Sequence, residues 1–278
     1  MIATLQAEFP AVSVRTVCLV LGISRGWVYA ARQRPPDAED AALVAQIEPI
    51  IAEHPGYGYR RVTAALRRQG CLINGKRVLR VMRAASLRCQ VRRYVQTTNS
   101  QHAFRRYPNL LRGLELTGPD QVWVADLTYL QFPRGTGYLA CVLDAWSRRC
   151  LGWALGEHLT TDLTAEALRQ AVLSRQPGPG LIHHSDQGVQ YANHRYTACL
   201  AALGAQVSMT AAGRPTENAR IEAFFSTLKR EEVWLHDYQH LAEARQSLSR
   251  FLDDVYNHKR LHSSLGYRPP AEFEQVAA

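Results

Sequence analysis

Three short segments rich in β-forming residues follow one another between residues 121 and 155. They cover residues 121–131, 138–143 and 150–155, with turn-forming residues between them. Short strands joined by tight turns pair as antiparallel hairpins. This part of the chain therefore predicts a three-stranded antiparallel meander.

Helices and strands alternate after the meander. Hydrophobic periodicity predicts a helix, a strand, a helix, a strand and two further helices, at about residues 161–174, 181–184, 193–203, 205–209, 216–234 and 241–257. In the last two segments, apolar residues recur at the i, i+3, i+4, i+7 spacing of a helix packed on one face. The order β-β-β-α-β-α-β-α is that of a ribonuclease-H-like fold. We therefore expect an α/β core with a mixed sheet flanked by helices.

The first 119 residues predict an all-α region instead. Residues 14–21 and 24–32 read as a first helix-turn-helix, with a plain helical hairpin as an equal alternative, and a longer helix follows at 37–53. Residues 60–68 and a helix capped by Asn74 predict a second helix-turn-helix. The predicted domains are an N-terminal helical or helix-turn-helix segment (1–53), a second helix-turn-helix-like DNA-binding region (54–90), a basic linker (91–118), and a catalytic core with a C-terminal helix and tail (119–278).

The net charge of +9 is distributed unevenly. Residues 1–119 carry 18 basic and 7 acidic side chains, hence +11, whereas residues 120–278 carry 15 and 17, hence −2. The 61 residues between Glu53 and Glu115 include 14 basic residues and no acid. Such a stretch is the expected electrostatic footprint of a nucleic-acid partner, with a solvated basic face as the alternative. The residues predicted to contact DNA in this stretch are Arg60, Arg61, Arg67, Arg68, Lys76, Arg77 and Arg80.

The six cysteines form no CxxC pair and have no histidine at zinc-finger spacing, so neither a zinc site nor a disulfide framework is indicated. No stretch approaches 18 uninterrupted apolar residues, and the start of the chain lacks a signal-peptide pattern. We expect a protein of the cytoplasm that is not associated with a membrane.

Three acidic residues occupy positions where an unpaired charge needs an explanation. Asp126 lies in the middle of an apolar strand, Asp186 directly follows a strand, and Glu222 lies beside the apolar stripe of a helix. A buried charge costs several kcal/mol unless it is paired or bound to a metal. Together these residues predict a cluster of hard oxygen ligands for two Mg²⁺ or Mn²⁺ ions.

Each acid also has a structural alternative. Asp126 could be an edge-strand acid paired with an arginine, Asp186 a turn-forming residue, and Glu222, like Glu217, a helix-start acid. We interpret Asp144 as a hairpin-turn residue and not as a fourth ligand. His183 and His184 are interpreted as packing groups or as groups that support the metal ligands from behind, because Mg²⁺ prefers oxygen ligands.

Several ordered motifs resemble a known family. The 35 residues between Asp186 and Glu222 are similar to the DD(35)E spacing of the retroviral-integrase catalytic core. The segments WVADLTY (123–129), HSDQGVQY (184–191), ENARIEAFFSTLK (217–229) and YNHKRLHSSLGY (256–267) resemble the OrfB transposases of the bacterial "insertion sequence three" family. The upstream segment HPGYGYRR (54–61) resembles the auxiliary helix-turn-helix of that family, so the match spans essentially the whole chain.

The resemblance implies a DDE transposase subunit that binds the DNA ends of its element and catalyses Mg²⁺-dependent cleavage and strand transfer. Asp126, Asp186 and Glu222 would be the catalytic metal ligands, and Lys229, on nearly the same helix face as Glu222, would contact a DNA phosphate. It also implies a homo-oligomer on DNA, and a partner or fusion from an upstream reading frame. Two other functions stay open: a non-enzymatic DNA-binding regulator with a degenerate core, and a ribonuclease-H-like nuclease that cleaves without joining.

Overall fold

The computed structural model describes residues 13–20, 22, 24, 26, 38–87, 104–133, 135–211 and 215–277. The first helix of the first candidate helix-turn-helix is present as α2 (Val14–Val20). Its predicted second helix, 24–32, lies outside the described residues apart from Ser24 and Gly26. The first 13 residues of the predicted linker, 91–103, lie outside them as well.

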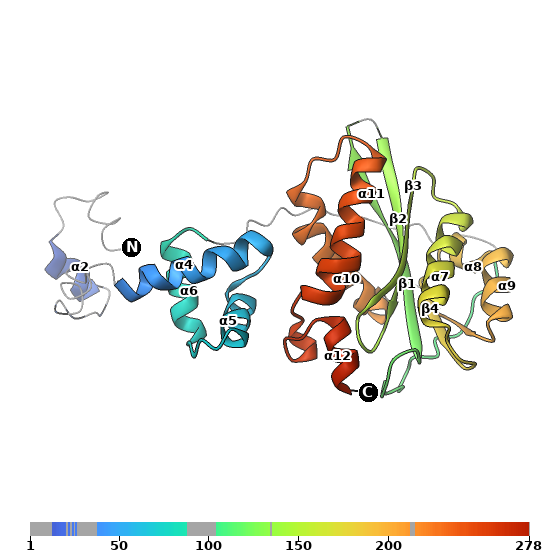
Figure 1. Ribbon diagram of the computed structural model, residues 1–278, viewed down its shortest axis with the longest axis horizontal. Coiled ribbons are helices and arrows are strands. Elements are labelled where there is room, and N and C mark those ends of the chain that lie inside the picture. The colour runs from blue at the N-terminus through green and yellow to red at the C-terminus, as the bar shows by residue number, and fades with distance from the viewer. Residues whose placement is uncertain are drawn as a thin grey trace.

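The core is built on a mixed five-stranded sheet with the order β3-β2-β1-β4-β5 (Figure 1). Its strands are β1 (Val122–Phe132), β2 (Gly135–Asp144), β3 (Cys150–Gly156), β4 (Ile182–Ser185) and β5 (Gln206–Met209). The first three strands pair antiparallel, and β4 and β5 continue the sheet in parallel to β1. The predicted meander and the ribonuclease-H-like order of elements are confirmed.

Helices cover both faces of the sheet (Figure 1). One face packs against α7 (Thr161–Arg175), α8 (Val189–Ala192) and α9 (His194–Ala202). The other packs against α10 (Ala219–Glu231), α11 (Leu241–Ser249) and the π-helical segment η3 (Arg250–Lys259).

Strand β1 contributes to the apolar core on each face of the sheet, because successive side chains of a strand point to opposite faces. Trp123 and Ala125 are buried on the α7 face, whereas Val122 and Val124 are buried on the α10 face. The alternation assigns the next even position, Asp126, to the α10 face.

Two predicted helices are interrupted. The segment 216–234 consists of a 3₁₀ turn (η1, Pro215–Asn218), α10 and a second 3₁₀ turn (η2, Val233–Leu235). The break after α10 occurs at Glu232, whose buried carboxylate accepts hydrogen bonds from Tyr238 and Ser247. These distant partners fix the carboxylate and, we infer, stop the helix there.

The segment 241–257 changes from α to π geometry at η3. Within it, Asn257 accepts a hydrogen bond from the Cys150 N–H and donates one to the Cys150 carbonyl, both at 2.9 Å. Cys150 belongs to the edge strand β3, whose outer backbone groups have no neighbouring strand to pair with. The Asn257 side chain therefore satisfies hydrogen-bonding groups that the edge leaves free. A π-turn changes the register of side chains on a helix, which is the kind of shift that such a contact needs.

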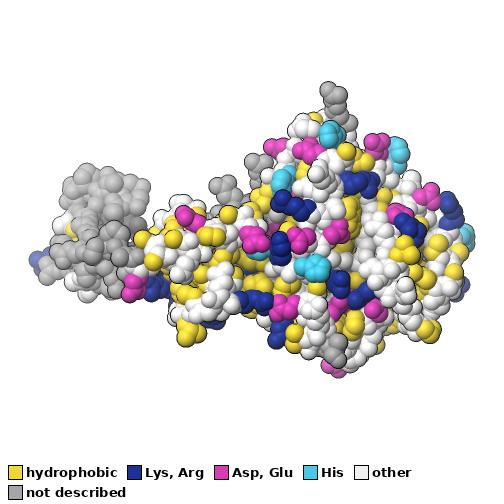
Figure 2. All heavy atoms as spheres, viewed as in Figure 1, with side chains coloured by type: hydrophobic (Ala, Val, Ile, Leu, Met, Phe, Trp, Pro, Cys, Tyr) yellow, Lys and Arg dark blue, Asp and Glu magenta, His cyan; other side chains and the backbone are white. Residues whose placement is uncertain are grey.

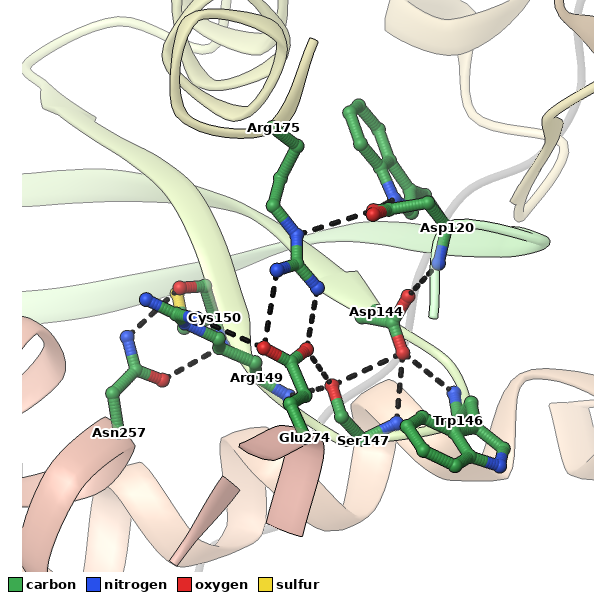
Figure 3. A network of polar contacts seen from close by, with 10 residues as sticks. Asp120, Asp144, Trp146, Ser147, Arg149, Cys150, Arg175, Asn257 and Glu274 are labelled. Atoms are coloured by element: carbon green, nitrogen blue, oxygen red, sulfur yellow. Dashed lines mark hydrogen bonds and ion pairs between the residues drawn. The ribbon is translucent and has the colours of Figure 1, made fainter. Parts of the chain in front are cut away.

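A polar network connects the C-terminal helix to the core (Figure 3). Glu274, in the C-terminal helix α12 (Pro270–Ala277), pairs with Arg149 and Arg175 and contacts the Ser147 hydroxyl. Asp144 accepts hydrogen bonds from the N–H groups of the hairpin turn at Trp146 and Ser147. Asp144 is therefore the hairpin-turn residue that the sequence indicated.

The helical region before the core consists of α4 (Ala38–Glu53), α5 (Tyr59–Arg68) and α6 (Gly75–Ala84), which share a small apolar core. Asn74 caps α6 by accepting a hydrogen bond from the Lys76 N–H at 2.9 Å, as predicted. No helix in the described part of the chain is long and apolar enough to cross a membrane.

Candidate active site

The register of two adjacent strands brings Asp126 beside Asp186. In the parallel pair β1 and β4, Ala125 lies opposite Ser185, which is the last paired position. The next residue on each strand is an aspartate. Neighbouring strands lie about 4.8 Å apart, so the two carboxylates leave the sheet side by side at the end of β4.

The third acid approaches from the helix above this face. Glu222 lies in the first turn of α10 and is exposed. Lys229 lies two turns further along nearly the same helix face, with its Nζ atom 5.2 Å from the centre of the Tyr129 ring on β1. Sequence reasoning did not single out Tyr129, because an aromatic residue at a strand position is ordinarily a packing residue.

The pKa of Asp126 reflects its burial and the charges of the other two acids. Burial, the charge of Asp186 and, to a smaller extent, that of Glu222 raise the pKa of Asp126 to about 8. A hydrogen bond from the Leu127 N–H and the charge of Lys229 oppose the rise. Asp126 is therefore protonated over most of the neutral range unless a further positive charge joins the site.

Asp186 has a second, local role. Its Oδ1 atom accepts a hydrogen bond from the Gly188 N–H at 2.9 Å, which makes a tight turn at the end of β4. A Cβ atom on residue 188 would lie 2.9 Å from the same Oδ1, so glycine leaves room for the carboxylate. The turn-forming role considered from the sequence is thus real and exists beside the position at the acidic site.

The two histidines before Asp186 point into the protein. His183 Nε2 lies 2.9 Å from the Tyr196 hydroxyl, and His184 Nδ1 lies 2.8 Å from the Ser208 hydroxyl. Both rings are buried, and this burial lowers their pKa values to about 3 and about 4. They are packing groups, as interpreted from the sequence.

Glu217 is occupied elsewhere. It accepts a hydrogen bond from the Ala211 N–H at 2.7 Å and pairs with Arg112 at 3.0 Å. Hydrogen bonds from Ala211, Asn109 and Arg112 lower the pKa of Glu217 to about 2. Glu217 thus braces the segment before α10, whereas the charge of Glu222 acts on Asp126.

The donor set fits a hard divalent cation. Two adjacent aspartates and a nearby glutamate offer only oxygen atoms, and burial together with the neighbouring negative charges raises the pKa of Asp126. In the described part of the chain, no three acidic, histidine or cysteine side chains are already drawn together around one metal position.

Most of the basic residues predicted to contact DNA have acidic partners within the chain. Arg61 pairs with Glu231 and Arg68 with Glu272, whereas Arg77 and Arg80 pair with Asp40. Arg67 donates to the Ile73 carbonyl and closes the turn between α5 and α6. Arg60 and Lys76 are exposed and have no ion pair with a described residue. On the face shown in Figure 2, basic and acidic side chains are likewise interspersed over the core.

The glycine- and tyrosine-rich segment 54–59 joins the helical region to the core. Glu231 at the end of α10 pairs with Arg61 and, through two hydrogen bonds of 2.6 and 2.8 Å, with the buried Arg260. A Cβ atom on residue 56 would lie 2.1 Å from Cγ of Glu231, so only Gly56 permits this approach. The Tyr57 hydroxyl accepts a hydrogen bond from the Leu261 N–H at 2.7 Å. The segment is a docking element as well as a break between helices.

Comparison with known proteins identifies the family of the chain. The family described as "Integrase core domain" matches residues 117–215 and 203–270, and the family "HTH-like domain" matches residues 37–94. The chain is 37% identical to the transposase for insertion sequence element IS904 of Lactococcus lactis, over 88% of this chain and 98% of that protein. It is 31% identical to transposase InsF for insertion sequence IS3A of Escherichia coli, over 97% and 95%. The chain belongs to the IS3 family of insertion-sequence transposases.

Solved structures similar to this IS3-family protein include a simian T-cell lymphotropic virus intasome, with 16% identity, a TM-score of 0.49 and coverage of 76% of this chain and 69% of that chain. Another is the HTLV-2 integrase catalytic core domain in complex with magnesium, with 15% identity, a TM-score of 0.42 and coverage of 56% and 97%.

Proposed function

We propose that this chain is a DNA strand transferase that binds the ends of its insertion sequence and uses two Mg²⁺ or Mn²⁺ ions to cleave and join DNA. The proposal rests on one observation above all, the action of the charges of Asp186 and Glu222 on the buried Asp126. Two of the three acids come from adjacent strands and one from the helix above them. Such a set of acids is costly to the folded state without a cation.

When bound, two divalent ions would activate the attacking oxygen and stabilise the leaving oxygen of a phosphodiester. The three carboxylates would hold these ions from elements fixed by two separate apolar cores. Lys229 adds one positive charge beside Asp126 and, held against Tyr129, would contact a phosphate of the reacting strand.

Contacts with DNA outside the acidic site would come from the helical region. Arg60 and Lys76 are the strongest candidates, because they are exposed and have no ion pair with a described residue. The other predicted arginines already have partners within the chain, so DNA would have to share or replace those contacts. They are Arg61, Arg67, Arg68, Arg77 and Arg80. We further propose that the protein acts as a homo-oligomer on DNA and with an upstream-frame partner or fusion.

The test is strand joining by the full chain on labelled DNA carrying the ends of the element. We expect Asp126→Asn, Asp186→Asn and Glu222→Gln each to lower Mg²⁺-dependent joining by about 10³-fold or more, because each removes a ligand worth several kcal/mol in the transition state. DNA binding should survive all three changes. Glu166→Gln, an acid on the far helix layer, is the matched control and should join normally.

The products separate the alternatives. Mg²⁺-dependent cleavage without joining would identify a nuclease, and binding with neither reaction would identify a regulator. Normal joining by any one of the three triad variants would overturn the assignment of that residue.

A further inference from the structure

A cavity of about 280 Å³ lies on the flank of α10 that faces the turn between β2 and β3. Its walls come from α10, from the turn between β2 and β3, and from the C-terminal segment around Ser263 and Ser264. An adjoining hollow shares Arg148 and Arg220 with it. The two hollows meet at these arginines. Together they are called the arginine groove below.

The charges around this cavity do not balance. Five arginines line it, and two of them, Arg61 and Arg260, are paired with Glu231. The other three, Arg148, Arg220 and Arg230, make no ion pair with any described residue.

Acidic residues near the cavity do not compensate these arginines. Asp144 lines the wall, but its two oxygens accept hydrogen bonds from the hairpin turn and from the Asp120 N–H. Glu115 lines the adjoining hollow and is exposed, without an ion pair to either shared arginine. Arg148 and Arg220 instead repel one another, since burial first and the charge of Arg220 second lower the pKa of Arg148.

The backbone at Arg148 adds an independent observation. Its φ angle is +65°, in the left-handed region that a glycine or asparagine adopts at lower cost. The Tyr256 hydroxyl donates to the Arg148 carbonyl at 3.1 Å and helps to hold this conformation. A strained position filled by a long cationic side chain points to a role for the side chain itself.

The cavity and the acidic site lie on the same face of the sheet, on different flanks of α10. Val124 lines the cavity, and Asp126 follows two residues later on β1, about 7 Å along the strand. On α10, Arg220 and Thr227 line the cavity, whereas Glu222 and Lys229 lie on the other flank of the helix. The cavity is therefore a second place on the core where DNA could be held.

We propose that Arg148, Arg220 and Arg230 form a binding site for a backbone phosphate of DNA held by the core. Guanidinium groups match the geometry of phosphate oxygens, and hydroxyls of Ser226, Ser263 and Ser264 on the same walls are additional donors. This inference rests on the proposed function, because it takes DNA to be the substrate. It assigns to the core a phosphate contact separate from Lys229 and from the helical region.

The experiment measures the affinity of the full chain for a fluorescent duplex of the element end between about 50 and 300 mM KCl. We expect Arg148→Gln with Arg220→Gln to weaken binding roughly ten-fold or more at low salt. The slope of log affinity against log salt should become less negative by about 0.9, the value for one phosphate. The control, Arg169→Gln with Arg195→Gln, removes the same charge from two exposed arginines on the α7 and α9 side and should leave the slope unchanged.

A second variant separates binding from folding. Arg148→Gly relieves the left-handed backbone, so we expect its Tm to rise by roughly 2–4 °C while DNA affinity falls. If both Arg148 variants bind DNA with the affinity and slope of the control, the phosphate site is overturned. If the slope changes as expected but the unaltered protein never joins DNA, the phosphate site stands and the proposed strand transfer fails.

Discussion

Helix α10 has an acidic side chain near each end, and the two have opposite surroundings. At its C-terminal end, Glu231 lies between Arg61 and the buried Arg260. Burial raises the pKa of Glu231, but the hydrogen bonds and charge of Arg260 outweigh burial, so the net shift is downward. At its N-terminal end, Glu222 acts on Asp126, whose pKa is raised to about 8 by burial first, then by the charge of Asp186 and least by that of Glu222.

The difference separates a structural acid from an acid for which we propose a ligand-binding role. A buried charge paired within the chain holds elements together, and removal of one partner leaves the other exposed to the full cost of desolvation. Acids brought close together repel one another, and a ligand of the opposite sign relieves that cost. The arginine groove on the flank of α10 is likewise a group of like charges, here positive ones.

The largest effect on stability is expected at the paired end. Glu231→Ala leaves Arg260, which is 2% exposed, without its carboxylate, so the free energy of unfolding should fall by about 3–5 kcal/mol. Chemical denaturation measures the change. Glu166→Ala, which removes an acid from the exposed pair with Arg169, should have almost no effect. Equal effects in the two variants would remove the distinction drawn between buried and exposed pairs.

A smaller loss is expected from crowding the same junction. Gly56→Ala puts a methyl group where Glu231 already lies and should destabilise the protein by about 1–3 kcal/mol. Gly58→Ala is the control, because no atom lies within 4 Å of a Cβ at residue 58 and its φ is −83°. A similar loss in both variants would show that the segment needs glycine for its backbone and not for the contact with Glu231.

The smallest effect belongs to the exposed pairs of the helical region. Arg80→Gln breaks a surface pair with Asp40, and the Tm should change by no more than ~2 °C. Arg60→Gln should likewise leave Tm unchanged but should weaken DNA binding, because that side chain is exposed and makes no ion pair with a described residue. DNA binding weakened by Arg80→Gln but not by Arg60→Gln would reverse the ranking of DNA contacts.

The elements of the core follow from local sequence. Strand alternation in Val122–Ala125 fixes which face each side chain takes, so the position of Asp126 could be predicted before the fold was known. The break of helix 216–234 could not, because Glu232 meets Tyr238 and Ser247 only in the folded chain.

Charge is the property that the sequence predicted least well. The stretch after Glu53 contains no acid for 61 residues, yet Arg61 and Arg68 find partners 170 and 204 positions away. The same limit applies to Arg148 and Arg220, which gave no signal because they are separated in the sequence and meet only at the groove. Counting charges along a chain predicts a polyanion partner but not which side chains remain available for it.

The most direct test of the distinction between paired and unpaired charges is the effect of Mg²⁺ on the Tm of the unaltered protein and of Asp126→Asn. Because folding raises the pKa of Asp126 from about 4 to about 8, the folded state binds more protons in that window, and this acid lowers stability as pH rises through it. Without divalent ions, Asp126→Asn should therefore have the higher Tm at pH 8 and lose that advantage near pH 5.

Added Mg²⁺ at pH 8 should raise the Tm of the unaltered protein and leave that of Asp126→Asn nearly unchanged. An equal rise in the two proteins, or a Tm difference between them that does not depend on pH, would contradict the account.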